Sequence, residues 1–164
     1  MFVRKAVKDD LDSLMTLFVF AKRIMHASGN VYQWNDAYPS AEIVLRDIDS
    51  GACHVACDDV TGEIMATMAL IPGPDPTYSK IYDGEWSDNG DYYVIHRIAA
   101  RKSGGGVAVK LFDYAFSLYP AIRIDTHRDN CIMHHVLQKY GFSYCGVIHL
   151  ANGDPRDAYC MRKQ

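Results

Sequence analysis

The stretch that decides the fold is residues 92–115, YYVIHRIAARKSGGGVAVKLFDYA, where a β-rich run leads into three glycines and then a helical pattern. The run 92–100 is rich in β-branched and aromatic residues, and the apolar residues of 106–118 recur at the helical period. Glycines let the backbone approach a phosphate closely, and the first N–H groups of a helix are unpaired donors. The junction is therefore a candidate anion-binding turn, although a plain glycine-rich turn has the same spacing.

Two common phosphate motifs do not fit this turn. A P-loop needs Gly-Lys-Ser/Thr, which does not follow the glycines. The Rossmann pattern fails because its third glycine position, counted from Gly104 and Gly106, is Val109.

The rest of the chain places this unit in a mixed sheet. A helix is expected from Asp9 or Asp10 to about Gly29, and the segments 54–58 and 63–70 predict an antiparallel hairpin around a four-residue turn. The remaining expected elements are strands at 2–7, 122–126, 142–150 and 158–161 and helices at 40–49 and 130–140. This order predicts an α/β (α+β) fold, and the length favours a single domain over residues 1–164.

Composition and charge exclude several classes of protein. The chain of 164 residues has a net charge of -3, which gives no broad positive field for a nucleic-acid partner. The first ten residues carry charges, and the apolar stretch 14–21 falls short of the roughly 20 residues that a bilayer span requires. We expect a cytoplasmic protein without nucleic-acid or membrane partners, and the sequence leaves a homodimer open.

The five cysteines form no CxxC pair and one is left over: Cys53, Cys57, Cys131, Cys145 and Cys160. This pattern favours five free thiols in a reducing compartment. The segment Cys53-His54-x-x-Cys57 has metal-binding residue types, but two thiols four residues apart in a strand lie about 13 Å apart. We therefore expect no metal site.

Three separated motifs resemble the GNAT superfamily of N-acetyltransferases in order and spacing. They are VIHRIAA with the glycine turn, RIDTHRDN and QKYGF, which together span about 91–146. The N-terminal GNVYQWNDAYPS also resembles bacterial members, so most of the chain is covered. The resemblance implies a mixed, mostly antiparallel central sheet flanked by helices, with acetyl-CoA held at a splayed pair of strands.

The phosphate motif of the superfamily, Gln/Arg-x-x-Gly-x-Gly/Ala, fits the turn in two registers. One starts at Arg101, and the other starts at Ser103 and ends at Ala108. We prefer the second, because it puts Leu111 and Phe112 where the family's helix carries its core pair. The cofactor contacts that the motif implies are Arg101, Lys102, Ser103, Gly104, Gly105, Gly106, Val107 and Ala108.

Further cofactor contacts follow from the same resemblance. Ile98 and Ala99 would contact the pantetheine arm through their main chain, where the strand 92–100 splays from its neighbour. Asn130 matches a family position that contacts the cofactor, and it also suits the N-cap of the following helix. Asp125, in the strand before it, is interpreted as surface charge.

The usual general acid of the family is missing. The family often places a tyrosine four residues before the glycine of the third motif, and this position is Leu137. Tyr140, one helical turn later, replaces it only if it faces the same way; otherwise it is a core residue.

His96 is the candidate general base. It resembles a strand histidine that serves arylalkylamine N-acetyltransferases in their proton path, and the alternative is a structural histidine within the sheet. Alternation predicts His96 and Ile98 on one face of the strand and Ile95 and Arg97 on the other. Glu85, in the long segment 71–91, is the substitute base if His96 faces the core.

Aromatic and acidic residues of two irregular segments are the candidates for the acceptor pocket, because they suit an ammonium group or a flat substrate. Several of them are expected to cover the core instead. The aromatic candidates are Tyr32, Trp34, Tyr38, Tyr78, Tyr82 and Trp86, and the acidic ones are Asp36, Asp83 and Glu85.

These observations predict an N-acetyltransferase that moves an acetyl group from acetyl-CoA to a primary amine of a small molecule or peptide by direct attack. One alternative is an acyltransferase that uses a longer acyl-CoA. The other is an acyl-CoA-binding sensor or partner module of the same fold with little or no catalysis, which the leucine at position 137 favours.

Overall fold

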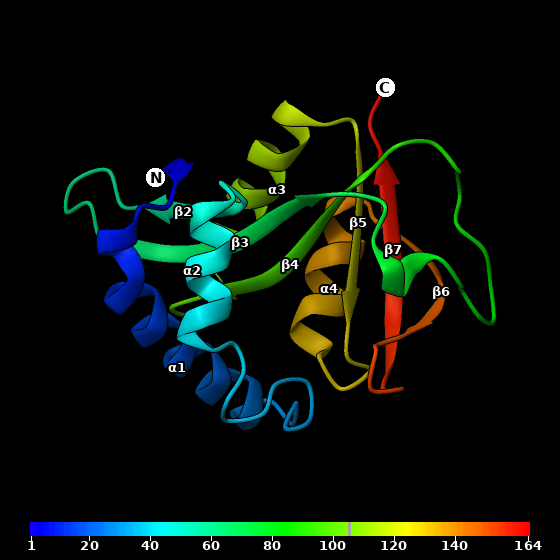
Figure 1. The fold of residues 1–164 in the computed structure, drawn as a ribbon, viewed down its shortest axis with the longest axis horizontal. Coiled ribbons are helices and arrows are strands. Elements are labelled where there is room, and N and C mark those ends of the chain that lie inside the picture. The colour runs from blue at the N-terminus through cyan, green and yellow to red at the C-terminus, as the bar shows by residue number, and fades with distance from the viewer. Residues whose placement is uncertain (105) are drawn as a thin grey trace.

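The computed structural model describes residues 1–104 and 106–164, which form one central sheet with helices on both faces (Figure 1). The strands are β1 (Phe2–Lys5), β2 (Cys53–Cys57), β3 (Ile64–Pro72), β4 (Tyr93–Ala100), β5 (Ala121–Thr126), β6 (Ser143–His149) and β7 (Pro155–Arg162). The helices are α1 (Leu11–Ala27), α2 (Ala41–Asp49), α3 (Val107–Leu118) and α4 (Cys131–Tyr140), with short 3-10 turns η1 (Lys8–Asp10) and η2 (Pro76–Tyr78).

The seven strands lie in the order β1-β2-β3-β4-β5-β7-β6. Among the described residues, β4 and β5 pair in parallel and every other neighbouring pair is antiparallel. The helix α3 connects the two parallel strands, as a crossover of this kind requires. The predicted mixed and mostly antiparallel sheet is confirmed.

Alternation along the strands divides the core into two layers. In β2, Val55 and Cys57 pack with Leu14 and Phe18 of α1, whereas Ala56, between them, packs with α3 and α4. Helices α1 and α2 therefore cover one face of the sheet and α3 and α4 cover the other (Figure 1).

The helix ends follow the capping residues in the sequence. Ser40 accepts a hydrogen bond from the Ile43 N–H at the start of α2, and Asn130 accepts one from the Met133 N–H at the start of α4. At the other end of α4, Gly141 takes a left-handed conformation with φ 116°. Among the described residues, none of the helices has the length and apolarity needed to cross a membrane.

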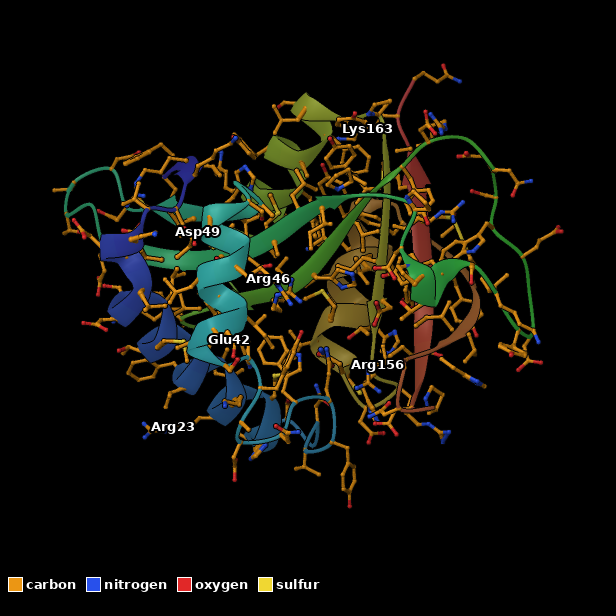
Figure 2. The ribbon with its side chains drawn as sticks, viewed as in Figure 1. Arg23, Glu42, Arg46, Asp49, Arg156 and Lys163 are labelled. Atoms are coloured by element: carbon orange, nitrogen blue, oxygen red, sulfur yellow. A yellow bond between two sulfur atoms is a disulfide. The ribbon has the colours of Figure 1, made fainter. Side chains whose placement is uncertain are left out.

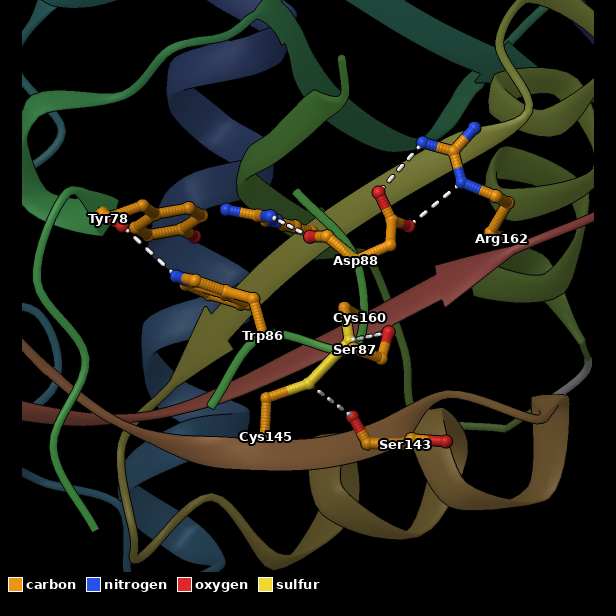
Figure 3. The surroundings of a disulfide bond; sticks show 9 residues. Tyr78, Trp86, Ser87, Asp88, Ser143, Cys145, Cys160 and Arg162 are labelled. Atoms are coloured by element: carbon orange, nitrogen blue, oxygen red, sulfur yellow. Dashed lines mark hydrogen bonds and ion pairs between the residues drawn. A yellow bond between two sulfur atoms is a disulfide. The ribbon is translucent and has the colours of Figure 1, made fainter. Parts of the chain in front are cut away.

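The prediction of five free thiols is wrong, because Cys145 and Cys160 form a disulfide between β6 and β7 (Figure 3). The two strands are antiparallel neighbours, and their register pairs Tyr144 with Tyr159, so the cysteines beside them come together. Counting cysteines along the chain does not reveal a pairing that depends on strand register. Cys53 and Cys57 are buried free thiols, and Cys131 is an exposed one.

Candidate active site

The parallel strands β4 and β5 separate at the centre of the sheet. They pair over only three residues, from Tyr93 with Ile122 to Ile95 with Ile124. Beyond this point β4 continues to Ala100 and β5 continues to Thr126, and no further pairs join them within the described chain. The sheet is therefore open between the two strands, and this opening is the predicted splay.

A β-bulge at Arg97 changes which face each residue of β4 occupies. On β3, Ala69 pairs with His96 and Thr67 pairs with Ala99, so two residues of β4 oppose one residue of β3. Arg97 has φ 51°, a left-handed value that is uncommon for a residue with a side chain. The predicted alternation is therefore wrong: Ile95 and Ile98 pack against the same core cluster.

The bulge directs the Arg97 side chain to α2. Its guanidinium donates to both carboxylate oxygens of Asp47, at 2.6 and 2.9 Å, and to the Tyr38 hydroxyl at 3.0 Å. Burial alone would lower the pKa of Arg97, but the bonds to Asp47 raise it above its ordinary value. This buried ion pair connects β4, α2 and the segment between α1 and α2.

A cavity of about 1120 Å³ runs along the opening between β4 and β5. One end is bordered by the glycine turn and the start of α3, and one wall is formed by α4. The other end is bordered by the α1–α2 segment and by the loop that leads into β7. One ligand can therefore lie along the strand edges from the glycine turn, while a second ligand enters from the other end of the cavity.

The glycine turn borders the first end. Lys102, Ser103, Gly104, Gly106, Val107 and Ala108 all line the cavity. Gly104 and Gly106 have φ values of +84° and +69°, and no atom lies within 4 Å of the position that a Cβ would occupy at either. The backbone is therefore bare on the cavity side, next to the free N–H groups of the first turn of α3.

Two residues of the turn that are predicted to contact the cofactor, Arg101 and Gly105, are not among the described residues that line the cavity. Arg101 lies off the cavity, because its guanidinium pairs with Glu63 and lies over the Phe20 ring. Its main-chain N–H donates to the Met65 carbonyl and holds the residue along β3. Gly105 lies outside the described residues.

The other predicted cofactor residues, Ile98, Ala99 and Asn130, also line the cavity. Asn130 is the N-cap of α4, and its amide donates to Gln33 Oε1 at 2.9 Å. Gln33 Oε1 also accepts from Asn30 at 2.9 Å and from the Thr126 hydroxyl at 3.3 Å. Gln33 thereby connects the α1–α2 segment to the end of β5.

His96 lies at the point where the strands separate, and its side chain is half-buried on the cavity wall. Its Nε2 lies 2.7 Å from Asp75 Oδ2. Burial alone would raise the pKa of Asp75, but hydrogen bonds from His96 and Thr77 outweigh it and lower the pKa to about 2. An ionised carboxylate only accepts hydrogen bonds, so Nε2 donates and Nδ1 is the acceptor nitrogen of the neutral ring.

Asp125 is the residue whose environment differs most from the prediction. It was expected at the surface, yet it lines the cavity and accepts a hydrogen bond of 2.6 Å from the Tyr78 hydroxyl. Burial raises the pKa of Asp125, and the nearby His96 and Tyr78 oppose part of this rise. Asp125 is on β5 directly after the three paired residues, so the opening brings it close to His96.

Tyr78 and Trp86 do not line the cavity, in contrast to the prediction. Tyr78 is 1% exposed, and its ring lies between those of Trp86 and Tyr92, with centroids 5.3 and 6.4 Å away. The Trp86 indole donates to the Tyr78 carbonyl at 3.1 Å (Figure 3). Both rings form a small core over β4 and β7.

Glu85 is exposed and does not line the cavity, so it is not the substitute base. The segment around it lies along β6: Tyr82 bridges to Val147, and a Cβ on Gly84 would be 2.1 Å from the Cys145 carbonyl oxygen. This close approach directs Asp83 and Glu85 to solvent. Asp36 is also exposed and off the cavity wall.

Tyr32, Trp34 and Tyr38 do line the cavity at its second end, which we call the acceptor end because the sequence predicts acceptor binding by these residues. Trp34 packs edge-on against Phe18 of α1 and against Tyr38, with centroids 5.8 and 6.0 Å apart. Tyr32 is 75% exposed and lies at the mouth, 6.5 Å from the His127 ring. This wall is therefore aromatic, and its inner part is fixed by the core.

The structure offers no tyrosine hydroxyl at the predicted acid positions on α4. Leu137 is fully buried in the core. Tyr140 touches the cavity wall, but its hydroxyl donates to Asp113 at 2.8 Å and accepts from Lys163 at 2.8 Å. Burial, followed by the bond to Asp113, raises the pKa of Tyr140 far above its ordinary value. Its proton is therefore held outside the cavity.

The cavity residues that sequence reasoning missed include Asp75, Arg97, Asp125 and Arg156. The sequence does hold a signal for Asp125, which follows Ile124 in a predicted strand. A charged residue in such a strand is rarely buried unless it has a partner, so its presence there indicates a contact with another polar group. A similar argument applies to Arg97. Asp75 lies in a segment without a period, so no pattern in the sequence connects it with His96.

Comparison with known proteins identifies the fold and the family. No family model and no curated protein sequence matches the chain. Among solved structures, a GNAT-family acetyltransferase from Streptococcus agalactiae is 33% identical, with a TM-score of 0.88 over 99% of this chain and 95% of that chain. A GNAT-family acetyltransferase from Listeria monocytogenes is 22% identical, with a TM-score of 0.71 over 98% and 94%.

A more distant structure shares the fold alone. The NatB acetyltransferase complex bound to CoA and MES is 14% identical, with a TM-score of 0.65 over 99% of this chain and 98% of that chain. The open sheet, the glycine turn before α3 and the identity with the streptococcal protein over almost the whole chain lead to one assignment. This chain belongs to the GNAT family of acetyltransferases.

Proposed function

We propose that the chain, as a single domain over residues 1–164, transfers an acetyl group from acetyl-CoA to a primary amine by direct attack. The carrying observation is that one cavity joins the bare glycine turn, the opening between β4 and β5 and the His96–Asp75 pair. The NatB complex of the same fold is bound to CoA, which supports the choice of thioester.

The residues at the first end fit acetyl-CoA. Gly104 and Gly106 leave open space where side chains would project, and the first N–H groups of α3 are free to bind phosphate oxygens. The unpaired edge of β4 at Ile98 and Ala99 offers main-chain groups to an extended arm. Bound acetyl-CoA would supply an activated thioester whose carbonyl carbon an amine can attack.

His96 is suited to accept the proton of the amine. An amine with a lysine-like pKa near 10.4 is almost wholly protonated at neutral pH, so its nucleophilic form costs about 4–5 kcal/mol. Asp75 holds Nε2 and leaves Nδ1 as the acceptor nitrogen. His96 therefore takes the first proton directly or through a water molecule, with Asp75 as the residue that positions the ring. As the amine nitrogen bonds to the acetyl carbon, the C–S bond breaks, and the CoA thiolate takes its proton from water or from the nitrogen of the product.

The test is thiol release from acetyl-CoA with a panel of polyamines, arylalkylamines, amino acids and aminoglycosides. The His96→Gln variant should lose about 10²–10⁴-fold of the rate at neutral pH, the usual contribution of a general base. It should bind acetyl-CoA normally and recover much of the loss near pH 10, where the free amine is abundant. His149→Gln is the matched control, because His149 stacks on Tyr82 away from the cavity.

A His96→Gln enzyme that keeps its rate and its pH profile would exclude His96 as the base. The second candidate, an acyl-CoA-binding module with little catalysis, is favoured by Leu137 in the core and by the engaged hydroxyl of Tyr140. Turnover of any amine in the panel excludes this candidate. Comparison of acetyl-CoA with longer acyl-CoA thioesters in the same assay tests the acyl-chain preference.

A further inference from the structure

Arg156 is a buried arginine on the wall of the acceptor end of the cavity. It lies at the beginning of β7, immediately before Asp157, which pairs with Thr126 at the end of β5. The residue is 5% exposed. Its side chain lies beside the segment that joins α1 and α2 (Figure 2).

The guanidinium of Arg156 has no acidic partner in the described chain. It donates to two backbone carbonyls, those of Pro155 at 3.0 Å and Gln33 at 3.1 Å. No carboxylate of residues 1–104 or 106–164 lies within 4.0 Å of it. Five N–H groups are available on a guanidinium, so donors remain for another acceptor.

Comparison with other arginines shows that Arg156 differs from each of them in its partners or its position. Arg97 pairs with Asp47, and Arg162 pairs with Asp88. Arg123 is also buried without an ion pair, but it lies between the Trp86 and Tyr92 rings, at 4.0 and 3.9 Å, away from the cavity. Burying a charge without a partner is costly.

The electrostatics agree with an anion site. Burial lowers the pKa of Arg156, and the more distant carboxylates of Asp125 and Asp154 offset part of this effect. A carboxylate from a ligand would restore the missing partner, and the planar guanidinium can bind it with two parallel hydrogen bonds.

The same end of the cavity also holds negative charge. The Asp75 carboxylate, whose pKa is lowered to about 2, lies beside His96, and Asp125, whose pKa is raised by burial, adds a hydrogen-bond acceptor through the oxygen that Tyr78 does not bind. An ammonium group is therefore attracted towards His96, while an anion is attracted towards Arg156. The two charges of the wall match a ligand that carries both an amine and a carboxylate.

We propose that Arg156 binds the carboxylate of the acceptor, so that the substrate of this enzyme is an amino-carboxylate, either a free amino acid or a short peptide with a free C-terminus. This inference rests on the proposed acetyl transfer. Arg156 acts in specificity, and it takes no part in the bond-making step.

The test compares acceptors that differ only in their carboxylate. The pairs are phenylalanine with phenylalaninamide, lysine with lysinamide, β-alanine with β-alaninamide, and glycyl-phenylalanine with its amide, each assayed by thiol release from acetyl-CoA. For at least one pair, kcat/KM should be at least about tenfold higher for the carboxylate, because the amide leaves the buried guanidinium unpaired. The peptide pair distinguishes a free amino acid from a peptide C-terminus.

The decisive quantity is the ratio of kcat/KM for the carboxylate acceptor to kcat/KM for its amide, compared between the wild type and Arg156→Gln. This comparison cancels the different amine pKa values of the two acceptors. In Arg156→Gln this ratio should fall at least about tenfold, because kcat/KM falls for the carboxylate acceptor alone. Arg156→Lys should be intermediate, because lysine keeps the charge without the planar guanidinium. Arg162→Gln, on the same strand but off the cavity, should keep the wild-type ratio.

The outcomes separate this inference from the function on which it rests. If amines without a carboxylate are acetylated as well as the paired acids, or if both members of a pair lose rate equally in Arg156→Gln, the inference is overturned and acetyl transfer stands. If no amine is turned over, the proposed function fails. Calorimetric binding of the same pairs to the CoA-loaded protein then decides whether Arg156 selects carboxylates: equal binding of acid and amide overturns it.

Discussion

Replacing Gly106 with valine tests whether the turn before α3 binds acetyl-CoA. Gly106 has φ +69°, and no atom lies within 4 Å of the position of a Cβ, so the folded protein has room for the new side chain. The cost to the folded state is backbone strain of about 1–3 kcal/mol. For a domain of this size, that strain lowers the Tm by about 2–4 °C for each kcal/mol.

The matched control is Gly62→Val in the turn between β2 and β3. Gly62 has φ +70° and the same open space around a Cβ, but it does not line the cavity. Both variants should therefore lose similar stability. Any difference between them in ligand response reports on the cavity alone.

Acetyl-CoA at about 100 times its Kd should stabilise the wild type and Gly62→Val by about 2.7 kcal/mol. In Gly106→Val, the valine side chain occupies the open space beside the turn, where the proposed function puts the phosphates of acetyl-CoA, so each tenfold loss of affinity removes about 1.4 kcal/mol of this stabilisation. Thermal unfolding over a range of acetyl-CoA concentrations measures the effect. A folded Gly106→Val protein with the same ligand-induced shift as Gly62→Val would remove the turn from the site.

Three further outcomes are expected. Tyr140→Phe should leave the chemical step nearly unchanged, and a loss above about a hundredfold in single-turnover kinetics would identify Tyr140 as the general acid. Because the pKa of Asp75 is lowered to about 2, its ionised form stabilises the fold above its unfolded pKa near 4, and this contribution is lost as pH falls through the folded pKa. Asp75→Asn should therefore lower the free energy of unfolding in urea by about 2 kcal/mol at neutral pH and by about half as much at pH 3. A loss of stability that does not change with pH would contradict the lowered pKa that Asp75 owes to His96 and Thr77. Finally, Cys131 is exposed whereas burial raises the pKa of Cys53 to about 11, so a thiol reagent at pH 8 should label Cys131 quickly and Cys53 slowly.

Local patterns in the sequence predict most of the architecture. The hairpin around Gly62, the caps at Ser40 and Asn130 and the strand-to-helix turn at Gly106 all depend on neighbouring residues, and all occur in the structure. The three GNAT-like motifs added the mixed, mostly antiparallel pairing of the sheet and the opening between two of its strands.

The side chains of the acceptor end could not be predicted in the same way. His96 meets Asp75 across 21 positions, and Arg97 meets Asp47 across 50, so both contacts depend on how distant segments pack. Tyr78 and Trp86 have the same residue types as Trp34 and Tyr38, but they cover a core while the other two line the cavity. Residue type alone does not separate these environments.

The bulge in β4 also determines what the deletion of one residue would do to the strand. If Arg97 is removed from the strand, the remaining residues from Val94 to Ala100 alternate regularly between the two faces, with Ile95, Ile98 and Ala100 on the side of α3. Arg97 is thus formally an inserted residue, and the strand absorbs it without moving any later side chain to the wrong layer. Deleting Arg97 would therefore keep every later side chain of β4 in its layer, and the cost would fall on α2, where the buried Asp47 carboxylate would lose its partner.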